Sequence, residues 1–166
     1  MKNINSTRFS HLTNEQKAYL AGFIDCDGSL MAQIVRKPDY AYKFQIRVTI
    51  QLSQRTSRIH FLKEIASEVG YGYVVSRNNM SDYVITQANI VYELLSLLLP
   101  YLRMKVKQAN LILKIIQELP SAKVSKDKFI ELCILANQVS ILNTPNKILK
   151  NTWQVVKAEL ESEDLQ

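Results

Sequence analysis

The sequence has few of the residues on which several common kinds of site depend. Its 166 residues include two cysteines, Cys26 and Cys133, and two histidines, His11 and His60. Two distant cysteines without a CxxC spacing predict neither a disulfide framework nor a zinc site, and they make a reducing compartment the default. The two histidines argue against hydrolases and nucleases whose sites are built from several histidines.

Long apolar runs are also missing. No stretch approaches the ~20 apolar residues of a membrane-spanning helix, and the first ten residues lack the apolar core of a secretory signal, so no membrane partner is expected. A hydrophobic content of 47% is ordinary for one globular domain with a core. We divide the chain into an N-terminal extension (1–12), a single domain (13–160) and a polar, acidic, frayed tail (161–166).

Acidic residues are scarce in one region of the chain. Between Gly28 and Lys63 there are seven lysines and arginines but one acid, Asp39, whereas the other residues carry fourteen cations and fourteen acids. The whole net charge of +6 therefore lies in this stretch. A concentrated basic stretch favours a polyanion partner, most often nucleic acid. The alternative is a solvated basic face that has no partner.

The stretch that organises the chain runs from Leu20 to Gly28, with the sequence LAGFIDCDG. Thr13 and Gln16 have the spacing of a capping box, which predicts that a helix begins there. The helix is apolar on nearly all sides, and this pattern indicates burial on more than one side. We expect it to end near Asp25, because the residues that follow are poor helix formers.

Two carboxylates, Asp25 and Asp27, stand at the C-terminal end of this predicted helix. The helix dipole is negative there, so carboxylates are disfavoured by roughly 0.3–1 kcal/mol each. Either they form local turn hydrogen bonds, as Asp often does before Gly, or a divalent cation such as Mg²⁺ offsets the repulsion.

The clearest strand in the sequence covers Lys43 to Ser53. Its apolar residues alternate with lysine, glutamine, arginine, threonine and serine, and no acid is present. Glutamine and arginine can form bidentate hydrogen bonds to adenine and guanine, and a β-ribbon fits the major groove. This polar face either contacts DNA bases directly or is only exposed to solvent.

The other periodicities predict the rest of the fold. Arg77 lies near a predicted hairpin tip, and cations crowd the start of a helix at Lys105, where either an anionic group or solvent must face them. The order of elements indicates an α+β fold with a four-stranded, mostly antiparallel sheet and C-terminal helices. The predicted strands are 30–35, 43–53, 73–77 and 83–86, with a hairpin at 78–81, and the later helices are 55–69, 89–99, 105–119 with a break at Pro120, 128–142 and 151–160.

The stretch from Leu20 to Gly28 resembles the nine-residue signature of the LAGLIDADG homing endonucleases. Phe23 replaces a leucine of that signature, and Cys26 replaces a small residue. Residues 51–58, 81–83 and 105–123 are similar to the single-motif subgroup encoded in organellar group I introns. The resemblance extends from Glu15 to Val155.

The resemblance implies an αββαββα core with a saddle-shaped four-stranded antiparallel sheet that straddles DNA. It implies a homing endonuclease that makes a metal-dependent double-strand break at a long pseudo-palindromic site. Cutting both strands needs two active centres, so a single-motif chain must act as a homodimer. The expected dimer interface is the motif helix, through Leu20, Ala21, Gly22 and Ile24.

The resemblance also assigns roles to individual residues. Asp27 is the expected metal ligand, Cys26 offers its backbone carbonyl, and the metal is Mg²⁺, with Mn²⁺ or Ca²⁺ possible. Gln54, Arg58 and Lys105 match residues around the metal and the attacking water, whereas Asp25 and Asp82 are supporting residues. The expected DNA contacts, taken from the resemblance and from the basic stretch, are Gln33, Arg36, Tyr40, Lys43, Gln45, Arg47, Gln51, Arg55, Arg77, Asn146, Lys147 and Lys150.

Two other functions are compatible with this fold. An RNA maturase would bind intron RNA and assist splicing, and a non-cleaving protein would bind DNA as a regulator. The presence of both motif acids favours the enzyme. The family suggests an organelle, most simply the chloroplast, with the mitochondrion as the alternative.

Overall fold

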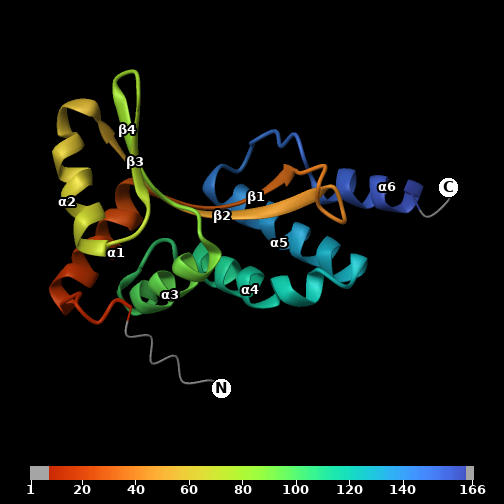
Figure 1. The fold of residues 1–166 in the computed structure, drawn as a ribbon, viewed down its shortest axis with the longest axis horizontal. Helices are drawn as coiled ribbons and strands as arrows, with labels where there is room; N and C mark the ends of the chain where they lie inside the picture. Colours follow the sequence, from red (N-terminus) through yellow and green to blue (C-terminus); the bar gives the residue numbers. More distant parts are fainter. Residues whose placement is uncertain (1–7, 164–166) are drawn as a thin grey trace. The chain divides into compact units, whose positions relative to one another are not determined.

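A computed structural model describes residues 8–163 of the chain, and its elements follow the predicted order (Figure 1). The N-terminal extension and the acidic tail fall partly outside these residues, at 1–7 and 164–166. The elements are α1 (Asn14–Asp27), β1 (Gly28–Arg36), β2 (Phe44–Arg55), η1 (Thr56–Arg58), α2 (Ile59–Val69), β3 (Tyr73–Arg77), β4 (Met80–Ile85), α3 (Ala88–Leu98), η2 (Leu99–Tyr101), α4 (Val106–Ala122), α5 (Lys126–Asn143) and α6 (Trp153–Glu163).

The described residues form two compact units. Unit 1 holds residues up to 29 and 49–106, and unit 2 holds residues 30–48 and those from 107 onward. In unit 1, α2 packs against the β3–β4 hairpin, and in unit 2, α5 and α6 pack together (Figure 1). The strands follow the order β1-β2-β4-β3, with β4 antiparallel to both β2 and β3. The predicted four-stranded α+β fold is confirmed.

The capping box at the start of α1 is present as predicted. Thr13 Oγ1 accepts a hydrogen bond from the backbone N–H of Gln16 at 3.2 Å, and Gln16 Oε1 accepts one from the backbone N–H of Thr13 at 2.9 Å. The predicted end near Asp25 is wrong, because α1 continues to Asp27. Gly28 then ends the helix, and a Cβ there would lie 2.6 Å from Ile24 Cα, so no other residue fits without a backbone shift.

Alternating burial along β1 and β2 confirms the period of two. In β2, Phe44, Ile46 and Val48 are buried, while Gln45 is half-buried and Arg47 is exposed. Lys43 lies outside the strand, in the β1–β2 turn, with a φ of 55°. The strand therefore begins one residue later than predicted, at Phe44, and the first residue of its polar face is Gln45.

Several predicted boundaries are wrong. Pro120 lies inside α4, which continues to Ala122, so the predicted break is placed two residues too early; the φ of about −65° that proline imposes is compatible with helical backbone. The β3–β4 turn is Asn78 and Asn79 alone, with Asn78 at a φ of 53°. The first part of the predicted frayed tail, 161–163, is helical because α6 extends to Glu163. No described helix is long and apolar enough to span a membrane.

Asp25 and Lys105 exchange hydrogen bonds within unit 1, and this exchange fixes the end of α1. The Asp25 carboxylate accepts from the backbone N–H of Arg103 at 2.7 Å and from that of Lys105 at 3.0 Å. In return, Lys105 Nζ donates to the carbonyl oxygens of Asp25 and Ile24, the latter at 2.9 Å. Asp25 is thus at the unfavourable end of α1 but beside the positive N-terminal end of α4. Asp25 is therefore an anionic group of the kind expected beside the cations at the start of α4.

The surroundings of Asp25 move the pKa of its carboxyl in opposite directions. Burial raises the pKa, but backbone hydrogen bonds from Arg103, Lys105 and Met104, together with the Lys105 charge, outweigh burial and lower it. A lowered folded-state pKa stabilises the fold above the unfolded-state pKa of ~3.9, and this stability is lost as the pH falls through the folded-state value.

We therefore expect Asp25→Asn to lower the free energy of unfolding at pH 7 by about 2 kcal/mol, the scale of hydrogen bonds to a charged group. The gap between the variant and the wild type should narrow as the pH drops below ~4. Urea unfolding at fixed protein concentration, at pH 7 and at pH 3, measures both quantities. Asp39→Asn, at an exposed turn, is the control. A gap that is independent of pH would show that the charge of Asp25 does not stabilise the fold.

Candidate functional site

Three of the four predicted catalytic residues form one hydrogen-bonded chain in unit 1. Asp27 is the last residue of α1 and its side chain is exposed. Gln54, near the end of β2, donates from Nε2 to Asp27 Oδ2 at 3.1 Å. Arg58, the last residue of η1, donates to Gln54 Oε1 at a longer 3.4 Å. The short path from β2 into η1 places a carboxylate, an amide and a guanidinium together at the end of α1.

This donor set fits a hard divalent cation only if other oxygens complete the coordination. Among residues 8–163, no cluster of three His, Cys, Asp or Glu side chains could hold a metal ion. Mg²⁺ is usually held by one or two carboxylates, with substrate phosphates and water as its remaining ligands. Asp27 offers an exposed carboxylate of this kind, and Cys26 beside it is exposed as a free thiol.

Lys105, the fourth predicted catalytic residue, is positioned differently. Its ammonium group donates to the carbonyl oxygens of Ile24 and Asp25 at the end of α1. A lysine in this position bonds the carbonyl oxygens of the last turn of a helix, although Ile24 O also accepts from the Gly28 backbone N–H. The structure therefore shows Lys105 as a residue that holds the helix end carrying Asp27, and its catalytic role stays a prediction.

Asp82, the predicted supporting residue, belongs to a second chain of polar contacts in unit 1. Its carboxylate, 9% exposed, accepts from Ser53 Oγ at 2.6 Å, and Gln51 Nε2 donates to the same Ser53 oxygen at 3.1 Å. Ser53 and Asp82 are direct partners in the β2–β4 register. Gln51, a predicted base contact, is thereby oriented through Ser53.

The polar side chains predicted to contact bases lie on one face of β1 and β2 in unit 2, and their contact with bases stays a prediction. Gln33, Gln45 and Arg47 occupy the odd-numbered positions, which face away from the buried residues Ile34, Phe44 and Ile46. Arg47 donates to Gln33 Oε1 at 3.2 Å, so the two strands present a linked guanidinium and amide. Tyr40 in the β1–β2 turn is 47% exposed.

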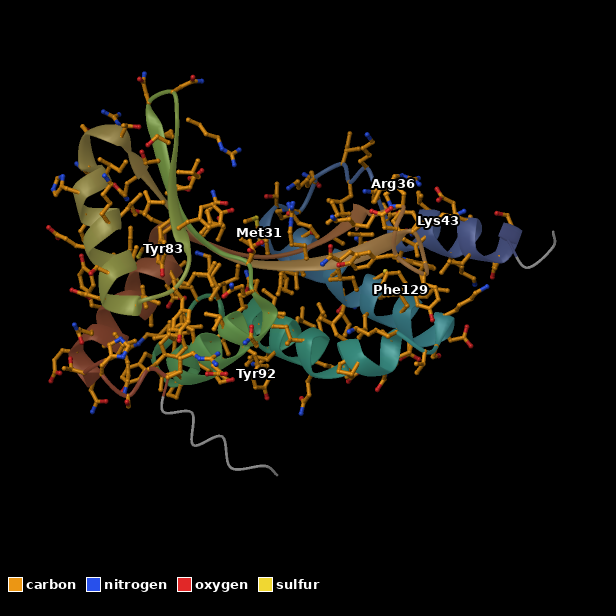
Figure 2. All side chains as sticks on the ribbon, in the orientation of Figure 1. Met31, Arg36, Lys43, Tyr83, Tyr92 and Phe129 are labelled. Atoms are coloured by element: carbon orange, nitrogen blue, oxygen red, sulfur yellow. The ribbon has the colours of Figure 1, made fainter. Side chains whose placement is uncertain are left out.

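Arg36, also predicted to contact DNA, does not belong to this face. It occupies an even-numbered position of β1, and its guanidinium lies 4.8 Å from the centre of the Phe44 ring. It forms a double hydrogen bond to the Glu159 carboxylate on α6, with one N–O distance of 2.9 Å. Figure 2 shows Arg36 and Lys43 at the end of the strands where α6 lies. Charge alone suggested Arg36, whereas the alternation of the strand assigns it to the helix side.

The Arg36–Glu159 ion pair shifts the pKa values of both of its members. The hydrogen bond from Arg36, with a smaller contribution from the Arg36 and Lys43 charges, holds the pKa of Glu159 below its usual range. The same pair raises the pKa of Arg36. Arg36 and Lys43 of the basic stretch therefore interact with the Glu159 carboxylate, which lies more than a hundred positions later. No local pattern in the sequence predicted this interaction.

The remaining predicted contacts are exposed side chains that no single element brings together. Arg55 ends β2, and Arg77 ends β3 in unit 1. The others lie in the turn before β2 or in the loop between α5 and α6 of unit 2. The exposed residues of this group are Lys43, Arg55, Arg77, Asn146, Lys147 and Lys150.

The predicted interface residues on α1 require a correction. Leu20, Ala21 and Ile24 are 6%, 0% and 0% exposed, because they pack into the core of unit 1. Gly22 is the exposed member of the set, and a Cβ placed there would meet nothing within 4 Å. Between its two ends, where Asn14, Glu15 and Asp27 are exposed, α1 has an exposed stripe of Ala18, Tyr19, Gly22 and Cys26.

The sequence patterns missed a group of hydroxyls next to the site. Ser81, fully buried, donates to Thr56 Oγ1 at 3.1 Å and lies 2.9 Å from the Ser76 hydroxyl. The Thr56 backbone N–H donates to Asn79 O at 2.9 Å. Thr56 thus connects η1, which carries Arg58, to the β3–β4 turn. The polar residues facing each other across β2, β3 and β4 were visible in the sequence, but their register was not.

Comparison with known proteins places this geometry in a family. The LAGLIDADG endonuclease family model matches residues 20–118. The DNA endonuclease I-CreI of Chlamydomonas reinhardtii is 46% identical over 144 residues, which cover 87% of this chain and 88% of that protein. The DNA endonuclease I-CvuI of Chlorella vulgaris is 40% identical over 131 residues, with coverages of 78% and 81%.

Solved structures with a similar fold are also homing endonucleases. The crystal structure of I-CvuI in complex with the I-CreI target in the presence of Mg, with the DNA not cleaved, has a TM-score of 0.84 at 36% identity. It covers 89% of this chain and 94% of that chain. The archaeal intron-encoded endonuclease I-Vdi141I, complexed with DNA, shares the fold with a TM-score of 0.78 at 19% identity, covering 92% and 98%. The motif helix, the sheet that follows it and these relatives together show that the chain belongs to the LAGLIDADG endonuclease family.

Proposed function

We propose that this chain is a site-specific DNA endonuclease that makes a metal-dependent double-strand break as a homodimer. The observation that carries the proposal is the exposed Asp27 carboxylate at the end of the motif helix, held by Gln54, which in turn accepts from Arg58. The homing endonuclease I-CvuI, with 36% sequence identity and the same fold, has been solved on its own DNA target with Ca and on the I-CreI target with Mg, where the DNA is not cleaved.

Asp27 and the Cys26 carbonyl are the groups we assign to a divalent metal, which we propose to be Mg²⁺. When bound, such a metal activates water for attack and neutralises charge on the scissile phosphate. Gln54 fixes one oxygen of Asp27, so the carboxylate is oriented before the substrate arrives. Arg58 lies next in this chain and brings positive charge to the place where the phosphate develops negative charge.

The homodimer follows from the exposed stripe of α1 and from the need for two centres. A twofold axis along this stripe would bring the two Asp27 carboxylates to the same region. Ala18 and Gly22, one helical turn apart, are small enough for two backbones to come close.

The polar face of β1 and β2 is our candidate for base recognition. Gln33, Gln45 and Arg47 carry the amide and guanidinium groups that bind adenine and guanine edges in the major groove. Lys147 and Lys150, in the α5–α6 loop, supply the charge that phosphate contacts need. Two such faces related by a twofold axis would read two half-sites of one long target.

We further propose that the protein acts in an organelle, most simply a chloroplast. The two relatives with 46% and 40% identity come from green algae, which carry this organelle. Locating the encoding gene in an organellar genome would support the proposal, whereas a nuclear gene without organellar import of the protein would contradict it.

We expect Asp27→Asn to reduce cleavage by about 1,000-fold or more, because it removes metal activation worth several kcal/mol. DNA binding should stay at the wild-type level. Single-turnover cleavage with Mg²⁺, and binding at one fixed salt concentration, measure the two effects. Asp127→Asn, an exposed change of the same charge on α5, is the control. Cleavage that survives in Asp27→Asn would rule out the metal assignment, and wild-type protein that binds intron RNA tightly but cuts no DNA would favour a maturase.

We expect Gly22→Leu to weaken the dimer about tenfold or more, since a side chain forced into a packed interface costs 1–3 kcal/mol. In an isolated chain the new side chain would meet open space and cause no such loss. Light scattering over a concentration series measures the dimer dissociation constant. Ser67→Leu, at an exposed position of α2, is the matched control. Equal dimerisation of the two variants would show that α1 is not the interface.

We expect Arg47→Ala to relax base preference at one position of each half-site by about 5–150-fold, the range of a bidentate base contact. Arg36→Ala should leave base preference unchanged, because Arg36 faces Glu159 on the helix side of the strands. Relative cleavage of duplexes with single base changes measures both. The assignment of the two faces is wrong if Arg36→Ala changes the preference and Arg47→Ala does not.

A further inference from the structure

Side chains of unit 2 occupy one edge of β1. This strand has a neighbour on one side only, β2, so the carbonyl groups of alternate residues point away from the sheet. Asn143 Nδ2 donates to Leu30 O at 2.7 Å, and Asn151 Nδ2 donates to Ile34 O at 3.0 Å. Between them, Ser140 Oγ lies 3.5 Å from Ala32 O. Three side chains thus meet the carbonyls of residues 30, 32 and 34.

The two asparagines stand at the two ends of one loop. Asn143 is the last residue of α5, and Asn151 lies two residues before α6, so residues 144–150 connect them. Within this loop the structure shows a turn bond from the Lys147 N–H to Thr144 O at 3.1 Å. Most of the loop is exposed, and Ile148 is 97% exposed. The path of the loop therefore depends on where its ends are held.

Length shows how much these ends matter. The carbonyls of Leu30 and Ile34 are four residues apart on one strand, or about 13 Å. The eight residue-to-residue steps from Asn143 to Asn151 could reach up to ~27 Å when extended. The loop is about twice as long as the distance it spans, so releasing either end would give it many alternative paths.

We propose that Asn143 and Asn151 are positioning residues for DNA binding, which hold Lys147 and Lys150 in a fixed place beside Gln33. Lys147, Lys150, Asn151 and Gln33 line the same hollow of unit 2, whose volume is about 290 Å³. The two asparagines are hydrogen-bonded to β1, the strand that carries Gln33. The loop is therefore held by the same strand as part of the proposed base-reading face. This inference rests on the proposed function and adds the residues that set the geometry of its phosphate contacts.

The alternative role for the asparagines is only to cover the edge of β1, and a double-mutant cycle separates the two roles. The variants are Asn151→Ala, Lys147→Ala with Lys150→Ala, and all three changes together. Dissociation constants for the cognate duplex over a salt series give affinity and the salt slope. The lysine pair should lower the slope by ~1.8, for two phosphate contacts.

Asn151→Ala alone should weaken binding about fivefold and lower the slope by ~1, as one contact is lost. It should have no further effect when both lysines are already alanine. Asn143→Ala should behave in the same way, and it replaces Asn151→Ala if that variant unfolds. Asn110→Ala, at an exposed position of α4, is the control and should match the wild type.

Equal losses from Asn151→Ala with and without the lysines would overturn the positioning role. Unchanged affinity after loss of both lysines would also overturn it, because the loop would then make no phosphate contact. In that case Mg²⁺-dependent cleavage by the wild type would leave the proposed function intact. Failure of the proposed function is distinct, since the wild type itself would then neither bind nor cut the duplex.

Discussion

The exchange of hydrogen bonds between Asp25 and Lys105 is the constraint on which the candidate site depends. The Asp25 carboxylate accepts from the backbone ahead of α4, and the Lys105 ammonium group donates to the last carbonyls of α1. The Asp25 carboxylate lies beside the positive N-terminal end of the α4 dipole, and the Lys105 ammonium group lies beside the negative C-terminal end of the α1 dipole. With α1 held at its end, Asp27 emerges two residues later, where Gln54 reaches it from β2. The two motif acids therefore differ, because Asp25 supports the helix end and Asp27 is exposed at the position that we propose for the metal ligand.

Most of the fold could be predicted because its signals are local. The capping box of Thr13 and Gln16 and the alternation of β2 each act within a few residues. The predicted break at Pro120 was wrong because the φ imposed by proline is compatible with helical backbone, and α4 continues to Ala122. The site was predictable as far as the family resemblance extends, which brought Asp27, Gln54 and Arg58 together. Arg36 was misassigned because charge says nothing about the face of a strand, and its partner Glu159 is distant in sequence.

One strand, β2, carries residues of both the proposed catalytic site and the proposed base-contacting face. Residues 44–48 of β2 belong to unit 2 and carry Gln45 and Arg47, whereas residues 49–55 belong to unit 1 and carry Gln51 and Gln54. The even positions from Phe44 to Leu52 are buried, while Gln45, Arg47 and Gln51 lie at odd positions; Gln54 is an even position beyond this buried run and is half-buried. The register between β2 and β4 pairs Ser53 with Asp82, and Ser53 connects Gln51, a proposed base contact, to the buried Asp82 carboxylate. Side-chain hydrogen bonds from asparagines support β1 at its other edge.

The proposed function requires two copies of this chain to cut both strands of one symmetric DNA target with a divalent metal. Selection of cleaved molecules from a randomised duplex library, with Mg²⁺ and wild-type protein, tests it most directly. We expect double-strand breaks at one family of pseudo-palindromic sites, with preferred bases in two half-sites over about two helical turns. Breaks without half-site symmetry, nicks in one strand only, or the absence of Mg²⁺-dependent cleavage would contradict it.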